Sequence, residues 1–235
     1  MSDPFNVLGV IPARGGSRGI PRKNLADVAG KPLIAYSIEA GLRSKNLTRL
    51  LVSTEDEEIA RVALEYGAAV PFRRPAELST DQARSLPVVQ HAVKAMEALD
   101  GCTYDAVAML QPTTPMRTAD DIGLGIQLLV DTGADSVISV VDVGANHPFR
   151  MKQILDDGRL VNFVDQGFED MRPRQELPPV YIRSGDLYVA RRHVVMELGT
   201  LVGPHCRAIV IPSARAVNID TGFDLERAKE MLGGL

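Results

Sequence analysis

Short apolar segments alternate with amphipathic segments along most of the chain. Continuous apolar runs rich in β-branched residues predict strands at 6–12, 49–53, 69–73, 106–110, 135–141, 186–190 and 208–211. Apolar residues three and four positions apart predict helices at 32–42, 57–66, 85–99, 118–132 and 223–232. Because the strands are apolar along their whole length, this alternation predicts an α/β fold with a mostly parallel sheet covered by helices on both faces.

Residues 142–184 interrupt this alternation. The stretch contains scattered prolines and glycines, and no helical period is clear in it. An irregular stretch of this length inside a compact domain is usually functional or interfacial. We therefore expect a main domain built from residues 1–141 and 185–235. Residues 142–184 are expected to form an inserted arm that leaves the sheet, pairs with another chain and returns.

Charge and cysteine usage narrow the range of partners. The formal net charge of −4 provides no bulk positive field, so neither nucleic acid nor an anionic membrane is expected as a partner. Cys102 and Cys206 lie far apart without zinc-binding spacing, which predicts reduced thiols. The first residues lack the pattern of a secretory signal, and no apolar stretch is long enough to span a bilayer. We therefore expect a cytoplasmic protein.

The loop that follows the first predicted strand, ARGGSRGIPRKN at 13–24, is the strongest candidate for binding chemistry. In open α/β sheets, ligands bind outside the carboxyl ends of the strands. Glycines let the backbone approach a ligand and present N–H groups to it, and cations match the distributed charge of a triphosphate. The spacing fits neither a P-loop nor a dinucleotide-binding glycine motif. The residues concerned are Arg14, Gly15, Gly16, Arg18, Gly19, Arg22 and Lys23.

Three later loops also carry polar and cationic groups, although each alone is compatible with ordinary helix capping. RRPAELSTD at 73–81 begins with two arginines. LQPTTPMR at 110–117 places Gln111 and Arg117 on either side of a stiff turn, and a glutamine can read a base or a sugar hydroxyl. NIDTGFD at 218–224 places Asp220 at a strand end, where its carboxylate could hold Mg²⁺ together with substrate phosphates.

These segments occur in a characteristic order. Together with RPRQELP at 172–178, they resemble the acylneuraminate cytidylyltransferase family, the CMP-sialic acid synthetases. The resemblance extends to enzymes that activate the bacterial nonulosonates legionaminate and pseudaminate, with CMP-Kdo synthetases as more distant cousins. It implies a Rossmann-like nucleotidyltransferase fold, a homodimer and a need for Mg²⁺. The implied reaction joins CMP from CTP to the anomeric hydroxyl of a 2-keto-3-deoxy sugar acid and releases pyrophosphate.

The resemblance also implies roles for individual residues. The implied catalytic residues are Arg14 and Lys23, which would bind the CTP phosphates, and Asp220. The implied nucleotide-binding residues are Ala13, Arg14, Gly15, Gly16, Asn24, Arg74 and Ser85. The implied sugar-binding residues are Gln111, Arg150, Arg174 and Tyr188, with Arg174 acting in the site of the partner subunit. The implied metal ligands are Asp220 and Asn218.

Two departures from the family pattern matter. Asn218 stands where the family commonly has the first of two aspartates, and an amide oxygen ligates a hard cation without supplying negative charge. This change motivates an alternative, a catalytically silent nucleotide-binding homologue. The aliphatic stretch GTLVG at 199–203 stands where sialate-specific members can present aromatic residues, which favours a related nonulosonate as substrate. Within the enzyme class, the alternative is a CMP-Kdo-type synthetase.

Overall fold

The computed structural model describes residues 5–17 and 19–234. A six-stranded sheet forms its centre, with strand order β10-β6-β9-β5-β1-β4. The strands are β1 (Val7–Pro12), β4 (Arg49–Ser53), β5 (Ala106–Met109), β6 (Ser136–Asp142), β9 (Tyr181–Arg191) and β10 (Cys206–Val210). β1 runs parallel to β4 and β5, and β10 runs parallel to β6, whereas β9 is antiparallel to both of its neighbours. The predicted α/β fold with a mostly parallel sheet is confirmed.

Helices cover both faces of the sheet, and the alternation of side chains along β1 shows why. Val7 and Ile11 pack in a core with helices α1, α2 and α4, while Leu8 and Val10 pack on the other face with α3 and α5. Successive side chains of a strand point to opposite faces, so a strand buried on both sides is apolar throughout. The helices are α1 (Leu33–Arg43), α2 (Glu57–Glu65), α3 (Ser85–Asp100), α4 (Ala119–Thr132), α5 (Arg192–Met196) and α6 (Gly222–Gly233).

Helix starts follow the capping chemistry of the sequence. Asp56 caps α2 by accepting hydrogen bonds from two backbone N–H groups of its first turn. Thr118 and Thr221 begin α4 and α6 with reciprocal capping boxes that involve Asp121 and Asp224. None of the helices in the described part of the chain is long and apolar enough to cross a membrane.

Two of the predicted strands differ from the structure. Residues 69–73 do not form a strand, since only isolated bridges join Ala69 to Leu51 and Arg73 to Thr54. Pro71 lies between them and has no N–H group to donate to a ladder. The strand predicted at 186–190 is the longer, antiparallel β9, because the chain returns along it from an excursion.

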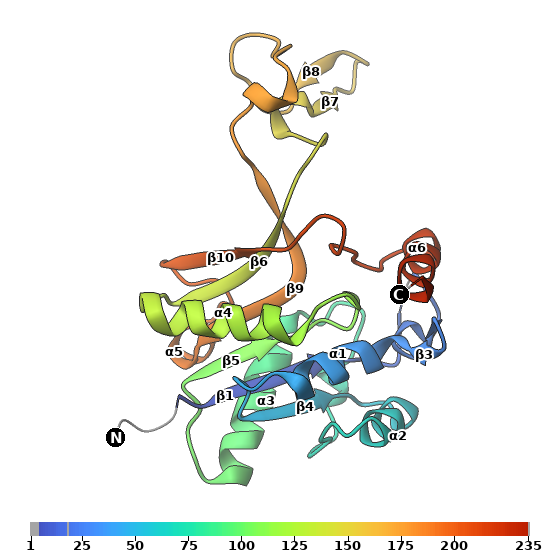
Figure 1. The fold of residues 1–235 in the computed structure, drawn as a ribbon, viewed down its shortest axis with the longest axis vertical. Helices are drawn as coiled ribbons and strands as arrows, with labels where there is room; N and C mark the ends of the chain where they lie inside the picture. Colours follow the sequence, from blue (N-terminus) through green and yellow to red (C-terminus); the bar gives the residue numbers. More distant parts are fainter. Residues whose placement is uncertain (1–4, 18, 235) are drawn as a thin grey trace.

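That excursion is the arm, residues 143–180, which stands away from the sheet (Figure 1). β6 leads into it and β9 leads out of it. The arm contains a small antiparallel hairpin of β7 (Lys152–Ile154) and β8 (Leu160–Asn162). A second small hairpin, β2 (Asp27–Val28) and β3 (Lys31–Pro32), follows the loop after β1. Short 3-10 helices lie at Lys23–Leu25, Ala76–Leu78, Pro148–Arg150 and Arg174–Glu176.

Candidate active site

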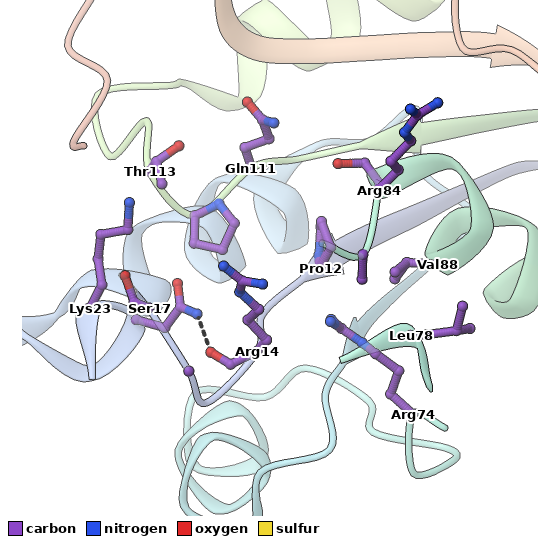
Figure 2. A pocket seen from close by; sticks show the side chains of 15 residues that line it. Pro12, Arg14, Ser17, Lys23, Arg74, Leu78, Arg84, Val88, Gln111 and Thr113 are labelled. Atoms are coloured by element: carbon purple, nitrogen blue, oxygen red, sulfur yellow. Dashed lines mark hydrogen bonds between the residues drawn. The ribbon is translucent and has the colours of Figure 1, made fainter. Parts of the chain in front are cut away.

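A pocket opens at the carboxyl ends of β1 and β5, beside the start of α3 (Figure 2). Its described lining contains four cationic side chains and no Asp or Glu. The lining residues are Pro12, Arg14, Gly16, Ser17, Lys23, Asn24, Arg74, Leu78, Ala83, Arg84, Ser85, Val88, Gln111, Pro112 and Thr113. A lining that contains several cations and no carboxylate favours an anionic ligand, although Arg14 and Lys23 each also lie near a carboxylate outside the lining, at Asp81 and Asp220.

Arg14 and Asn24 fix the loop that follows β1. The Asn24 side-chain amide donates a hydrogen bond to the Arg14 carbonyl at 2.9 Å, which ties the two ends of the loop together. The Arg14 guanidinium donates to the Thr80 carbonyl at 2.5 Å and lies 3.2 Å from the Asp81 carboxylate. The loop therefore lies against residues 80–81, which precede α3, and the pocket lies beside this contact.

Lys23 connects this loop to the segment before α6. Its ammonium donates to the Ile219 carbonyl at 2.7 Å and lies 3.5 Å from Asp220 Oδ1. A Cβ atom at Gly19 would lie 2.5 Å from the Asp220 carbonyl oxygen, so only glycine allows this close approach. Asp220, which does not itself line the pocket, is thereby held next to a residue that does.

Arg74 is the buried cation of the pocket. Its guanidinium donates to both the carbonyl and the hydroxyl of Ser53, at the end of β4. Burial lowers the pKa of Arg74 to about 10; the nearby Glu55 carboxylate opposes this shift and the Arg14 charge adds to it. The side chain therefore stays protonated near neutral pH and contributes a fixed positive charge.

Arg84 is a pocket cation that sequence reasoning missed. It occupies the N-cap position of α3, directly before Ser85, and is exposed. Within the part of the chain that the structure describes, its guanidinium forms no ion pair. The signal was in the sequence: a cation directly before the first residue of a predicted helix lies at the helix end where anions bind.

Two predicted nucleotide-binding residues do not line the pocket. The Ala13 N–H group donates to the Ser53 carbonyl at 3.0 Å and so extends the sheet. The Gly15 N–H group donates to Glu55 Oε1 at 2.7 Å, and a Cβ atom there would lie 2.4 Å from the Asp56 carboxylate. Gly15 is thus needed for approach to the protein's own carboxylates, whereas Gly16 lines the pocket.

The other loop cations also differ from the expectation. Arg22 does not line the pocket and forms ion pairs with Asp56 and Glu58. Arg18 lies outside the described residues. The cations that meet in the pocket therefore come from three separate segments, namely the loop after β1, the segment after α2 and the start of α3.

A second pocket adjoins the first and shares Ser85 and Gln111 with it. Its lining residues are Ser85, Leu86, Met109, Gln111, Arg183, Tyr188, Gly199, Thr200, Leu201 and Val202. Two of the predicted sugar-binding residues, Gln111 and Tyr188, are therefore brought together. The aliphatic segment 199–203 contributes one wall of this pocket, and its Leu201 and Val202 are among the lining residues.

The remaining predicted sugar-binding residues, Arg150 and Arg174, lie in the arm and line neither pocket of their own chain. Arg150 donates to the Arg172 carbonyl at 2.9 Å. Arg174 lies 3.2 Å from the Asp142 carboxylate, at the base of the arm.

Asp220 and Asn218, the two predicted metal ligands, lie next to each other before α6. The Asn218 amide nitrogen donates to Asp220 Oδ2 at 3.1 Å, and the Asp220 side chain is 67% exposed. Among the described residues, no group of three or more His, Cys, Asp or Glu side chains could hold a metal ion. These two side chains alone are too few to hold Mg²⁺. They fit a Mg²⁺ ion whose remaining ligands are substrate phosphates and water.

Comparison with known proteins gives a consistent result. A family model described as "Cytidylyltransferase" matches residues 8–148. The chain is 35% identical over 222 residues to pseudaminic acid cytidylyltransferase of Campylobacter jejuni, covering 94% of each chain. It is 32% identical over 229 residues to CMP-N,N'-diacetyllegionaminic acid synthase of Legionella pneumophila, covering 97% of each.

More distant matches extend the comparison. N-acylneuraminate cytidylyltransferase of Escherichia coli is 30% identical over 223 residues, which cover 94% of this chain and 51% of that protein. Among solved structures, a CMP-2-keto-3-deoxy-manno-octonic acid synthetase in complex with CTP superposes with a TM-score of 0.70 at 19% identity, covering 97% of this chain and 99% of that chain. At this identity the match shows a shared fold.

Proposed function

The chain belongs to the cytidylyltransferase family, and from this premise we propose that it transfers CMP from CTP to the anomeric hydroxyl of a nonulosonic acid. Pyrophosphate is the second product. The observation that carries the proposal is the pocket with four cations and no acidic lining residue among those described. Such a lining matches the charge of a triphosphate, and the adjoining pocket would accommodate the acceptor sugar.

The chemistry follows from this geometry. The sugar hydroxyl attacks the α-phosphorus of CTP and loses its proton to solvent. The bond between the α-phosphorus and the α–β bridging oxygen breaks, and pyrophosphate leaves with the electron pair. Such transfers depend mainly on positioning and on neutralising charge. Arg14 and Lys23 would neutralise the leaving pyrophosphate, while Arg84 at the start of α3 would hold a phosphate oxygen.

We further propose that the reaction uses Mg²⁺. Asp220 would provide the carboxylate ligand and Asn218 an amide oxygen, with CTP phosphates completing the set. A bound Mg²⁺ would supply charge neutralisation and lower the pKa of a ligated hydroxyl. Asp220 would hold the ion close to the phosphate-binding loop, because its carboxylate lies 3.5 Å from the Lys23 ammonium.

The acceptor is proposed to be a nonulosonate of the pseudaminate or legionaminate type. Relatives of nearly the same length are named for these sugars. Leu86, Leu201 and Val202 provide an aliphatic wall to the second pocket. Such a wall suits the apolar substituents of a modified sugar better than a chain of hydroxyl groups, because hydroxyls buried there would lose hydrogen bonds to water.

A homodimer is proposed to complete each site. The arm exposes large apolar side chains that one chain alone leaves in water. They include Ile154, Leu160, Phe163, Phe168 and Met171, all more than half exposed. Exposed apolar surface of this kind favours an interface. The same arm carries Arg150 and Arg174, which line neither of the two pockets described above. A partner's site would give Arg174 a sugar carboxylate to bind with two hydrogen bonds.

The setting of the reaction is proposed to be the cytoplasm. Cys102 and Cys206 are both free, which is compatible with a reducing compartment. Neither cysteine lines the two pockets, so the chemistry proposed for them does not depend on a thiol.

The test is to identify the product. The protein is incubated with CTP, Mg²⁺ and one of a panel of sugar acids, including pseudaminate, legionaminate, N-acetylneuraminate and Kdo. We expect a phosphodiester signal of a CMP-sugar by phosphorus NMR with the first two acids. Turnover of Kdo alone would favour the CMP-Kdo-type alternative. CTP binding without turnover of any acid would favour the catalytically silent homologue.

A further inference from the structure

Gln111 lies where the two pockets meet, and its backbone is held from several sides. The Gln111 carbonyl accepts hydrogen bonds from the Arg117 guanidinium, from the Ser37 hydroxyl at 3.3 Å and from the Thr114 hydroxyl at 3.1 Å. These bonds fix the main chain of the turn that follows β5. They do not involve the side-chain amide, whose position must depend on other contacts.

Arg117 is the anchor of this arrangement. Only 4% of the residue is exposed, and its guanidinium also donates to Ser37, to Thr114 and to the Asp186 carbonyl. Burial lowers the pKa of Arg117 to about 10, against the opposing charge of the nearby Asp186 carboxylate. A fully hydrogen-bonded, buried guanidinium has little freedom to move, so the turn and β9 are held in fixed relation.

The Gln111 amide faces a part of β9 where the regular pairing with β6 is interrupted. Pairing between β6 and β9 shifts register between Ile138 and Val140, so β9 has extra residues at this point. Ser139 holds the irregularity together, because its hydroxyl is hydrogen-bonded to the Ser184 hydroxyl and to the Leu187 N–H group, both at 2.8 Å. Gly185 lies within it and has a φ of +86°.

Gly185 is in direct contact with the end of the Gln111 side chain. A Cβ atom at Gly185 would lie 2.8 Å from Gln111 Oε1, a separation that real Cβ atoms do not tolerate. The positive φ explains why glycine is favoured here. The contact shows that the absence of a side chain at Gly185 leaves room for the Gln111 amide. Because the opposing atom is the free end of a flexible side chain, a methyl group would displace the amide and leave the core intact.

We propose that Gly185 is a positioning residue for the transfer reaction, which leaves space for the Gln111 amide at the junction of the nucleotide and sugar pockets. This inference rests on the proposed function and adds that the irregularity in β9 sets how tightly the acceptor sugar binds. The arm is attached through this same strand. Gly185 therefore acts on the sugar through Gln111 and touches neither substrate.

Gly185→Ala tests the contact. We expect the KM for the sugar acid to rise about 3- to 10-fold, the loss of roughly one hydrogen bond, with the KM for CTP unchanged. Gly30→Ala is the matched control, because Gly30 has a φ of +83° with no atom within 4 Å of its Cβ position. It carries the same backbone strain outside the pockets, so it should lower the melting temperature similarly and leave both KM values unchanged.

A double-mutant cycle with Gln111→Ala separates positioning from a general structural role. If Gly185 acts through Gln111, then Gly185→Ala adds no further change in sugar KM once the Gln111 amide is absent. Additive effects, or an unchanged sugar KM in Gly185→Ala, would overturn the proposal. If the alanine variant does not fold, Gly185→Asn replaces it, since asparagine adopts positive φ more readily and still places a Cβ atom there. A wild-type protein that turns over no sugar acid would instead contradict the proposed function.

Discussion

The Lys23 ammonium and the Asp220 carboxylate lie 3.5 Å apart, although the two residues are 197 positions apart in the chain. The contact joins the loop after β1 to the segment that precedes α6. Asp220 is 67% exposed, whereas the Lys23 side chain is 15% exposed and lines the cationic pocket. The pair therefore places the Asp220 carboxylate at the edge of the site where the phosphates would lie.

Replacing Lys23 tests the role of this loop in catalysis. Lys23→Ala removes a cation that would stabilise the leaving pyrophosphate, and losing such a contact typically costs on the order of 10²–10³ in rate. We expect that loss in kcat/KM for CTP, measured by pyrophosphate release, with a circular dichroism spectrum like that of the wild type.

Arg22→Asn is the matched control for Lys23→Ala. Arg22 lies in the same loop, but its guanidinium pairs with Asp56 and Glu58 instead of lining the pocket. Asparagine suits its positive φ of 54°. We expect near wild-type activity from this variant. Near-normal kcat/KM in Lys23→Ala would show that the loop binds something other than the phosphates.

A Mg²⁺ titration tests the roles of Asp220 and Asn218. Asp220→Ala should abolish Mg²⁺-dependent turnover, because it removes the carboxylate that we propose as the metal ligand. Asn218→Ala should raise the Mg²⁺ concentration needed for half-maximal rate. Asn218→Asp should lower that concentration, because it adds a negative charge near the metal. If both Asn218 variants keep the wild-type midpoint, Asn218 serves only as the hydrogen-bond donor to Asp220.

Arg84 is expected to hold the triphosphate. Removing a hydrogen bond to a charged group costs roughly 1.5–3 kcal/mol when it is well formed, so Arg84→Ala should raise the KM for CTP by about 10-fold or more. Its exposure predicts no loss of thermal stability. Arg73→Ala is the control: Arg73 is also exposed, but its guanidinium lies 3.5 Å from Glu57 and does not line the pocket. Equal KM values in the two variants would contradict the assignment.

Mixed dimers test whether the arm serves the partner subunit. Arg14→Ala damages a chain's own nucleotide pocket, and Arg174→Ala would damage the sugar site of its partner. In a mixed dimer both lesions fall in one site and leave the other intact. When equal amounts of the two variants exchange subunits at random, about half of the dimers are mixed. In each mixed dimer one of the two sites is intact, so roughly a quarter of wild-type activity should return.

The arm experiment has its own control. Arg159 also lies on the arm and pairs with Asp157 at 2.7 Å, so Arg159→Ala should remain active by itself. If the two inactive variants remain inactive after exchange has been demonstrated by mass spectrometry, Arg174 acts in its own chain or in no site.

Sequence patterns predicted most of the sheet because each strand carries its own signal. The apolar runs that became β1, β4, β5 and β6 are mostly buried and can be read residue by residue. The edge strand β10 was also predicted, although only Ile209 of its five residues is buried. The direction of β9 could not be read in this way, since an antiparallel strand buried on both faces has the same composition as a parallel one. It follows instead from the return of the arm, which is a property of the whole topology.

The candidate site shows the same division. The cations of the loop after β1 could be recognised locally, but which of them reach the pocket depends on distant partners. Arg22 forms an ion pair with Asp56, and the Gly15 N–H group donates a hydrogen bond to Glu55, so neither group is available to a ligand in the pocket. The contact between Gly185 and Gln111 depends on a register shift in β9 that has no signal in the spacing of apolar residues.

The most direct test of the central claim measures pyrophosphate release with each of the four ribonucleoside triphosphates, with and without pseudaminate or legionaminate. We predict release that requires the sugar acid and Mg²⁺, is selective for CTP and matches CMP-sugar formation one to one. Lys23→Ala should remove it and Arg22→Asn should keep it. Pyrophosphate release that is independent of the sugar acid, or equal with all four nucleotides, would contradict cytidylyl transfer as the function of this pocket.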